Sequence, residues 1–242
     1  MNEQITLGKW TSGSLDLLLK EASEIPRTGE RIDFLSRQFL NTKYKEATLR
    51  GDIDTPEVFV TNLEAVDCLT FIEYIEAMRR SRSFNEFRDN LMRVRYRSGL
   101  QAFRNRNHFF TDWKAFNSDM IMDVTRSIAP GKSKDVSKRL NEKQDGSFFL
   151  PGIQCRLREV TYIQTVNLDE PILNGLETGD YVGIYSKEEG LDVSHTGIIV
   201  RQDSTVYLRH ASSLKQNMKV IDEKLMDHLK SKPGIIVLRP RD

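Results

Sequence analysis

The apolar residues of this chain change their spacing in its last third, and that change limits the folds open to it. Up to about residue 127 they recur at i, i+3 and i+4, which is typical of helices with one buried face. Beyond about residue 176 they form short β-branched or aromatic runs bounded by Gly, Asp, Ser or Pro. These strand candidates are Tyr181–Tyr185, His195–Val200, Val206–His210 and Ile235–Arg239. Their close spacing predicts antiparallel pairing, and helices followed by strands predict an α+β fold.

We expect one catalytic domain over residues 1–242. Its predicted parts are helical at about 14–127, a linker or insertion at about 128–175 and an antiparallel sheet at about 176–242. The predicted elements of the first part are two helices within 14–50 that Pro26 and Gly29 separate, a strand at Val58–Val60, and helices at 68–80, 84–98 and within 115–127. The stretch from Pro130 to Pro151 is rich in Lys, Ser, Gly and Asp, which predicts a loop with at most one helical turn.

The composition excludes several classes of protein. Hydrophobic residues make up 38% of the chain and charged residues 29%, which is typical of a globular protein and not of a disordered one. The formal net charge is +1, so we expect no nucleic-acid partner, and we expect the arginine-rich stretch 82–106 to form a solvated face. No apolar run approaches the roughly 18 residues that a membrane-spanning helix requires, so we expect no membrane span.

Cys68 is the first candidate for chemistry. It follows Asp67 and begins the predicted helix 68–80, where the positive end of the helix macrodipole favours a thiolate. The N–H groups at a helix N-terminus can bind an oxyanion, and Asp67 is a suitable N-cap. The other interpretation is a buried, inert cysteine on an apolar helix face. Because the chain has only Cys68 and Cys155, a disulfide framework and a four-cysteine zinc site are both excluded.

Two of the four histidines lie on neighbouring predicted strands. His195 begins one strand and His210 ends the next, so antiparallel pairing would bring the two imidazoles side by side. A thiol, a base that accepts its proton and a polar group that orients the base are the parts of a cysteine hydrolase. The other interpretation is a pair of histidines that serve only packing or the surface.

Short motifs around these residues resemble a known group of enzymes. Asp67-Cys68 opening a helix, Ser194-His195-Thr196-Gly197-Ile198 and His210-Ala211-Ser212 together resemble the NlpC-type, papain-like cell-wall amidase superfamily. Further segments resemble its bacterial N-acetylmuramoyl-L-alanine amidase-like family: Val66–Glu73, Arg95-Tyr96-Arg97 with Gly99, Arg106–Phe110, and Trp113. The resemblance runs from about residue 30 to the C-terminus. The superfamily's common Asp-Cys-Ser-Gly is Asp67-Cys68-Leu69-Thr70 here, and this departure favours the amidase branch.

The resemblance implies a fold and a reaction. The implied fold is a papain-like core with N-terminal helices packed on a C-terminal antiparallel sheet and a helical or loop insertion. The implied reaction is hydrolysis of the amide between N-acetylmuramic acid and L-alanine in peptidoglycan fragments, with Cys68 as nucleophile, His195 as base and His210 orienting His195. No cofactor or metal is implied. The expected substrate-binding residues are Asp67, Tyr96, Arg106, Asn107, His108, Trp113, Ser194 and Ser212.

Other functions stay open at this point. The chain could be a γ-D-glutamyl-diaminopimelate endopeptidase of the same superfamily or a non-catalytic muropeptide-binding module. Zinc hydrolysis through Cys68, His195 and His210 is a further alternative, and a disulfide between Cys68 and Cys155 would silence the nucleophile. The expected partner is a sugar-peptide derived from peptidoglycan, and the sequence indicates no particular oligomeric state.

A cell-wall substrate implies a periplasmic or exported protein, whose signal would have been removed before Asn2. A cytoplasmic enzyme that handles imported wall fragments is the alternative, because the segment from Met1 to Trp10 is polar and contains no apolar signal region.

Overall fold

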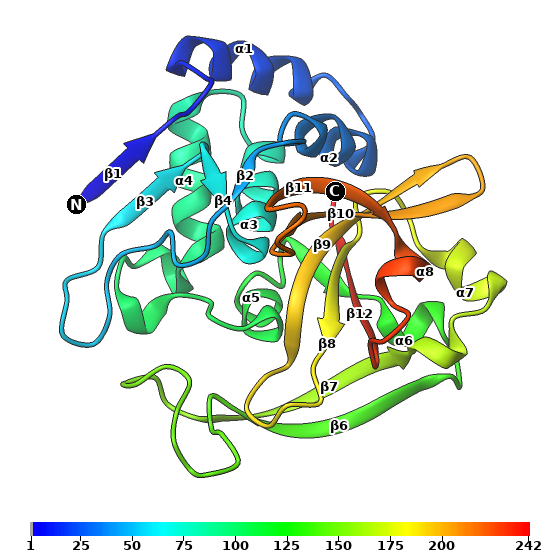
Figure 1. Cartoon of the computed structure of the whole chain (residues 1–242). Coiled ribbons are helices and arrows are strands. Elements are labelled where there is room, and N and C mark those ends of the chain that lie inside the picture. Colours follow the sequence, from blue (N-terminus) through cyan, green and yellow to red (C-terminus); the bar gives the residue numbers. More distant parts are fainter. Residues whose placement is uncertain (1) are drawn as a thin grey trace. The chain divides into compact units, whose positions relative to one another are not determined.

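The computed structural model describes residues 2–242 and contains both helices and an antiparallel sheet, so the α+β prediction is confirmed (Figure 1). The chain forms two compact units. The first contains the residues up to 107, together with 209–222 and residue 242, and the second contains 108–208 and 223–241. The predicted division into helical, linker and sheet parts of one catalytic domain stays a prediction.

The first unit holds the helices that the apolar spacing predicted. They are α1 (Ser12–Ser23), α2 (Thr28–Arg37), α3 (Cys68–Arg79) and α4 (Phe84–Arg95), followed by the short 3-10 turns η1 (Arg97–Gly99) and η2 (Phe103–Asn105). Its strands are β1 (Glu3–Thr6), β2 (Lys43–Tyr44), β3 (Phe59–Asn62) and β4 (Ala65–Val66). β1 pairs with β3 and β2 pairs with β4, and both pairs are parallel.

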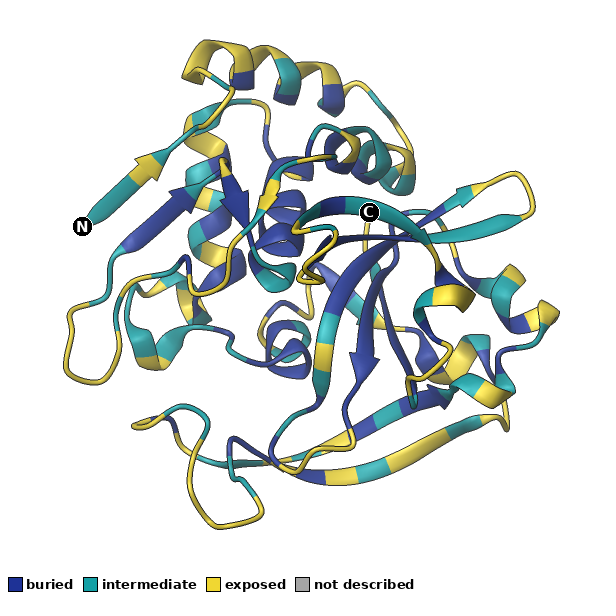
Figure 2. Ribbon diagram, in the orientation of Figure 1, coloured by how far each residue is buried: buried dark blue, intermediate teal, exposed yellow. Residues whose placement is uncertain are grey.

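Helix α3 forms the centre of the first unit. Every residue from Thr70 to Arg79 is buried, so the helix lacks the solvated face of an ordinary amphipathic helix (Figure 2). The aromatic ring of Phe71 packs 5.7 Å from Phe39 of the segment after α2, and Tyr74 packs 6.2 Å from Phe87 of α4, measured between ring centroids. This burial fixes the direction of the helix whose first residue is Cys68.

The second unit is built around an antiparallel sheet. Its helices are α5 (Phe110–Phe116), α6 (Thr125–Ile128), α7 (Glu170–Gly175) and α8 (Leu225–His228), with the 3-10 turn η3 (Thr165–Asn167). Its strands are β5 (Ile121–Asp123), β6 (Ser133–Leu140), β7 (Arg156–Gln164), β8 (Tyr181–Tyr185), β9 (Val193–Gln202) and β12 (Gly234–Pro240). The hydrogen-bonded order is β9-β8-β12-β7-β6, and β5 pairs with β12. β10 (Thr205–Ser212) and β11 (Lys219–Lys224) contribute residues to both units.

Strand β8, which lies between β9 and β12 in the sheet, is buried along its whole length. Gly183 in its middle is required by a close approach, because a Cβ atom there would lie 2.6 Å from the ring of Phe110 and 2.6 Å from Val193. The absence of a side chain at this position lets α5 pack directly on the strand that pairs with β9.

Two predictions for the middle of the chain are wrong. The stretch 130–151, predicted as a loop, contains β6, which pairs with β7 over eight residues. The predicted helix within 115–127 is instead the end of α5, the strand β5 and the single turn α6. β6 is largely exposed and carries polar side chains, so it lacks the alternating apolar residues by which strands are recognised. Among the described residues no helix is long and apolar enough to span a membrane.

Candidate active site

Cys68 is the first residue of α3, and the N-terminus of this helix is firmly capped. Asp67 is the N-cap, as the sequence predicted, and its carboxylate accepts a hydrogen bond from the N–H of Thr70 at 2.8 Å. In return the hydroxyl of Thr70 accepts a hydrogen bond from the N–H of Asp67 at 3.0 Å. Thr70 therefore occupies the N3 position of the capping box, where Glu or Gln is usual, and accepts the hydrogen bond from the N-cap backbone. The box fixes the backbone on both sides of the half-buried Cys68.

Opposing effects act on the pKa of the Asp67 carboxyl group. Burial raises its pKa, and the hydrogen bonds from Thr70 and the charge of Arg95 oppose that effect. The thiol of Cys68 and the carboxyl of Asp67 both act electrostatically on Tyr44, whose pKa is raised by burial and then by these two groups. Tyr44 is paired with Val66 across β2 and β4, which explains its proximity. Tyr44 was not predicted as a site residue, because a two-residue strand leaves no periodic signal in the sequence.

A buried ion pair lies behind the capped turn. Arg95 of α4 donates from Nε to Glu73 of α3 at 2.7 Å and from Nη1 to the carbonyl of Val60 in β3 at 2.5 Å. Its guanidinium carbon also lies 5.4 Å from the ring centre of Tyr74. Arg95 is fully buried, so the prediction that the arginine-rich stretch forms a solvated face is wrong at this residue. The pair joins three elements behind Cys68 and thereby fixes the position of α3.

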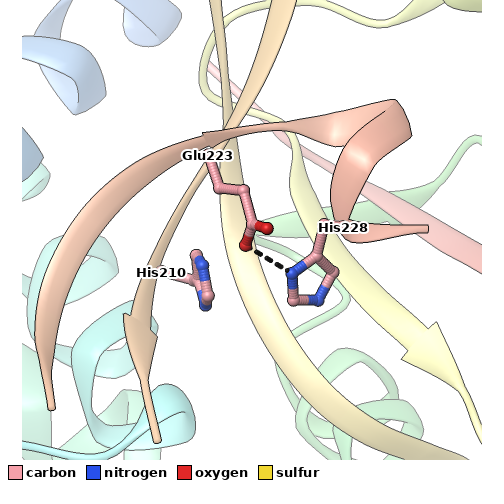
Figure 3. A group of neighbouring side chains, drawn as sticks. All are labelled: His210, Glu223 and His228. Carbon is pink, nitrogen blue, oxygen red and sulfur yellow. Dashed lines mark hydrogen bonds and ion pairs between the residues drawn. The ribbon is translucent and has the colours of Figure 1, made fainter. Parts of the chain in front are cut away.

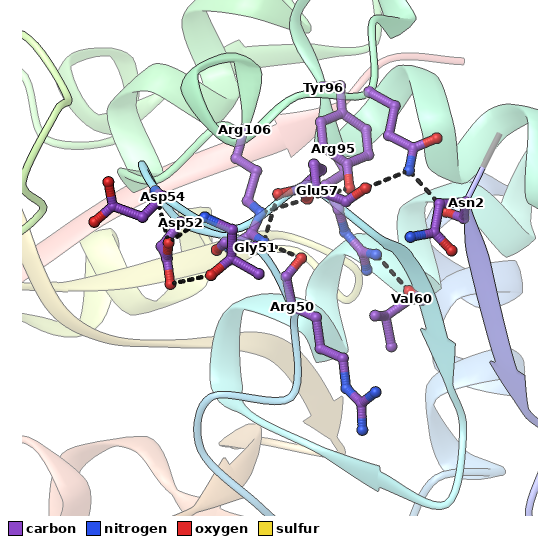
Figure 4. A network of polar contacts seen from close by, with 12 residues as sticks. Asn2, Arg50, Gly51, Asp52, Asp54, Glu57, Val60, Arg95, Tyr96 and Arg106 are labelled. Atoms are coloured by element: carbon purple, nitrogen blue, oxygen red, sulfur yellow. Dashed lines mark hydrogen bonds and ion pairs between the residues drawn. The ribbon is translucent and has the colours of Figure 1, made fainter.

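Three of the expected substrate-binding residues hydrogen-bond to the protein itself, and two of them, Arg106 and Tyr96, hold the loop that carries Glu57. Arg106 donates to both carboxylate oxygens of Glu57 at 2.7 Å, and Tyr96 donates its hydroxyl hydrogen to Glu57 at 2.6 Å (Figure 4). Arg106 also donates to the carbonyl of Arg50 at 2.7 Å, and Asn107 donates to the carbonyl of Val94 at 3.0 Å. These contacts tie the segment 50–57 to the end of α4. Sugar binding by Tyr96, Arg106 and Asn107 stays a prediction.

His195 belongs to the second unit and lies on β9, in register with Ile184 of β8. The ring centroid of His228, in α8, lies 5.7 Å from that of His195, and the ring planes are inclined by 31°. Part of the His195 surface reaches solvent, but its dense surroundings lower the pKa of His195 to about 3. Desolvation is the main cause, and the charges of His228 and Lys232 add to it. The imidazole is therefore neutral at physiological pH and able to accept a proton.

His228 is held by Glu223, whose carboxylate lies 2.9 Å from its Nδ1 atom (Figure 3). The bond joins the end of β11 to α8 and sets the direction of the His228 ring. Neither residue was a predicted site residue. No motif marks them, and only the small number of histidines in the chain could have drawn attention to His228.

The start of β9 is anchored by a buried carboxylate. Asp192 accepts hydrogen bonds from both the N–H and the hydroxyl of Thr111 at 2.7 Å, and from the N–H of Val193 at 2.7 Å. Burial raises the pKa of Asp192, while these hydrogen bonds oppose the increase. The contacts join α5 to the residues just before His195, and they position the candidate base within its unit.

The remaining predicted residues fall in both units. His108 is half-buried and Ser194 is exposed, and both belong to the second unit. Trp113, in the same unit, is fully buried against Phe110 and Tyr181, so it has the surroundings of a core residue. His210 and Ser212 lie on β10 in the part assigned to the first unit, and both are buried.

Both cysteines are thiols in the described part of the chain, so the structure contains no disulfide that would consume Cys68. Burial, and then Glu142, raises the pKa of Cys155. Cys155 is therefore poorly suited to act as a thiolate.

The family model for AmiA-like, N-acetylmuramoyl-L-alanine amidase-like proteins matches residues 34–235, which is most of the chain. The chain belongs to this family. A comparison with curated proteins finds no match to this amidase-like chain. This membership confirms the resemblance at the level of the family. The family is described as amidase-like, so the chain belongs among amidase-like proteins.

Solved structures agree with the family assignment. Two crystal structures of an N-acetylmuramoyl-L-alanine amidase from Bacteroides uniformis have TM-scores of 0.74 and 0.72 and are 28% and 27% identical to this amidase-like chain. Each match covers 89% of this chain and 99% of the other. A Legionella pneumophila protein shares the fold with a TM-score of 0.81 at 21% identity, over 96% of this chain and 94% of that one.

Proposed function

We propose that this chain is a cysteine amidase with a papain-like, NlpC-type core that hydrolyses the amide between N-acetylmuramic acid and L-alanine in peptidoglycan fragments. The observation that carries the proposal is the position of Cys68 at the first residue of α3, directly after an N-cap with a complete capping box. A cysteine at this position has the helix dipole and backbone N–H groups next to its sulfur. Membership of an amidase-like family supports the same reaction class.

In the proposed mechanism, His195 takes the thiol proton and the sulfur of Cys68 attacks the carbonyl carbon of the muramoyl group. The backbone N–H of Cys68 binds the oxyanion, the C–N bond breaks, and His195 returns the proton to the leaving amine of L-alanine. Water then attacks the thioester with His195 again as base, which releases the muramoyl carboxylate and restores the thiol. His210 orients His195 throughout.

The lowered pKa of His195 is consistent with its role as the base, which must be unprotonated before the reaction begins. A histidine with a pKa of about 3 is neutral at physiological pH and offers a lone pair to the thiol. The negative charge that develops on the sulfur then stabilises the imidazolium. The desolvated surroundings make each of these electrostatic contributions larger than it would be in water.

The amidase reaction is favoured over the endopeptidase reaction by the residues next to the nucleophile. Leu69 and Thr70 stand where the superfamily commonly has Ser and Gly, and Thr70 is committed to the capping box. We propose Asp67, Tyr96, Arg106, Asn107, His108, Ser194 and Ser212 as the substrate-binding set, and we leave out Trp113 because it is fully buried against Phe110 and Tyr181. A peptidoglycan substrate would place the protein in the periplasm or outside the cell.

The assignment of the catalytic residues is tested with three variants on a purified muropeptide. Cys68→Ala and His195→Ala should each abolish turnover while the circular dichroism spectrum stays that of the wild type. His210→Ala should retain more activity, because an orienting group is partly replaceable. Cys155→Ala is the matched control and should keep full activity.

Incubation of the wild type with a chelator separates the cysteine mechanism from zinc hydrolysis. Activity that survives the chelator and is lost in Cys68→Ala supports the proposal. Undiminished turnover by Cys68→Ala would remove its basis.

A further inference from the structure

A hollow on the second unit lies next to the candidate base. Its volume is about 350 Å³, and its lining includes Tyr185, Lys187, Ser194, Ser231 and Lys232. Ser194 directly precedes His195 in β9, and the charge of Lys232 acts on His195 strongly enough to lower its pKa. Ser194 and Lys232 thus connect the hollow to the candidate base, and all of these residues belong to the second unit.

The two lysines of this hollow are available to a ligand. Among residues 2–242, the ammonium groups of Lys187 and Lys232 have neither a hydrogen-bond partner nor an ion-pair partner. The lining contains serine hydroxyls and a tyrosine but no carboxylate. Two cations that form no ion pair and lie beside hydroxyl donors form a binding surface for an anion, and a carboxylate is the anion of a peptide.

The wall that carries Lys187 is rigid. Tyr185 stacks on Tyr162, with the ring centroids 3.8 Å apart and the planes inclined by 8°. The buried ammonium group of Lys138 donates to the carbonyls of Ser186 and Glu188 at 2.7 Å, on either side of Lys187. The backbone that bears Lys187 is therefore held in place before any ligand binds, which lowers the entropic cost of binding.

The second lysine is anchored at its backbone. The carbonyl of Lys232 accepts a hydrogen bond from the hydroxyl of Thr165 at 2.7 Å, and its N–H donates to Leu229 at 3.0 Å. The same short segment carries His228, whose ring lies beside His195. The segment therefore connects the hollow to the surroundings of the base.

We propose that this hollow binds the peptide side of the substrate, with Lys187 and Lys232 recognising a carboxylate of an acidic stem peptide. This inference rests on the proposed function, in which His195 gives its proton to the leaving amine. The leaving group of that reaction is the peptide, so a hollow beside the base receives the peptide and not the sugar. The lysines then select muropeptides whose residue after L-alanine bears a free α-carboxylate.

The test compares two substrates that differ in one charge. N-acetylmuramoyl-L-alanyl-D-glutamate and its D-isoglutamine analogue have nearly the same size, but the analogue has a carboxamide in place of the α-carboxylate. The wild type should have a KM about fivefold lower for the acid, and raising the salt concentration should reduce this preference. The double variant Lys187→Gln/Lys232→Gln should lose the preference, whereas Lys134→Gln, at an exposed lysine of β6, should keep it.

The comparison within one enzyme cancels any change that Lys232→Gln makes to the pKa of His195, because both substrates meet the same base. An acid preference that survives in the double variant would overturn the inference. If the wild type hydrolyses neither substrate, the proposed function fails, and the hollow is tested by NMR titration with the dipeptide L-alanyl-D-glutamate. Binding that is equal in the wild type and in the double variant would then overturn the inference, and binding lost only in the double variant would support it.

Discussion

The imidazole rings of His195 and His228 lie 5.7 Å apart, and the second ring is held at its Nδ1 atom by Glu223. His195 is therefore not an isolated histidine at the start of a strand. Its proton affinity is set by the dense packing around it and by a second imidazole whose direction is fixed by a carboxylate. This relationship makes the behaviour of the candidate base with pH a test of the structure.

Replacement of His228 by Gln should shift the acid side of the activity profile. The charge of His228 lowers the pKa of His195, so its removal should raise that pKa and move the acid limb of kcat/KM to higher pH. Because desolvation is the larger cause, the shift should be less than about one pH unit. NMR titration of His195 in the wild type and in His228→Gln gives the same quantity directly. An acid limb that stays in place would show that the two rings are not coupled.

His195 should also make folding stability depend on pH. Its pKa is about 3 in the folded protein and about 6.5 when unfolded, so the unfolded chain binds more protons between these values. The stabilisation is present above pH 6.5 and is lost as the pH falls toward 3. At pH 4.5 the loss should be about 2.7 kcal/mol. Urea unfolding of the wild type and of His195→Gln at pH 4.5 and 7.5 measures it, and parallel losses in the two proteins would contradict the assignment.

The buried ion pair of Glu73 and Arg95 should be essential for the stability of the first unit. Arg95→Met leaves the carboxylate of Glu73 buried without its guanidinium, which should reduce the free energy of unfolding by about 3–5 kcal/mol. Arg93→Met is the matched control, because Arg93 is exposed on the same helix, and its effect should stay within about 0.5 kcal/mol. Similar losses in the two variants would show that the pair does not stabilise α3.

The two thiols should differ in reactivity. Burial and Glu142 raise the pKa of Cys155, so it should be mostly protonated at neutral pH, while Cys68 lies at the N-terminus of α3. Iodoacetamide at pH 7, followed by peptide mapping, should therefore modify Cys68 first. Faster modification of Cys155 would argue against Cys68 as the thiolate.

The sequence predicts the parts of the fold in which apolar periodicity and capping signals agree. Asp67 before the run from Phe71 to Met78 predicts both the helix and its N-cap, and the structure contains both. β6 was missed because its exposed Lys, Ser and Asp side chains carry no apolar alternation. Tertiary contacts decide the burial of Arg95, since only the folded chain brings Glu73 and Val60 to its guanidinium.

The candidate site was predictable to a similar extent. Cys68 and His195 could be singled out because one begins a helix and the other lies near the start of a strand. Glu223, His228 and Tyr44 could not, because their importance comes from proximity to other side chains and not from their own sequence context. Asn107 and Arg106 were chosen for their donors, and in the structure those donors bind the protein's own carbonyl and carboxylate groups.

Identification of the bond that is cut separates the amidase from the endopeptidase. The purified protein is incubated with a disaccharide-tetrapeptide, and the products are identified by mass spectrometry, with Cys68→Ala as the inactive control. We predict free disaccharide and an intact stem peptide that begins with L-alanine. A muramyl product that retains L-Ala-D-Glu would show cleavage at the γ-D-glutamyl bond and would contradict the proposed amidase activity.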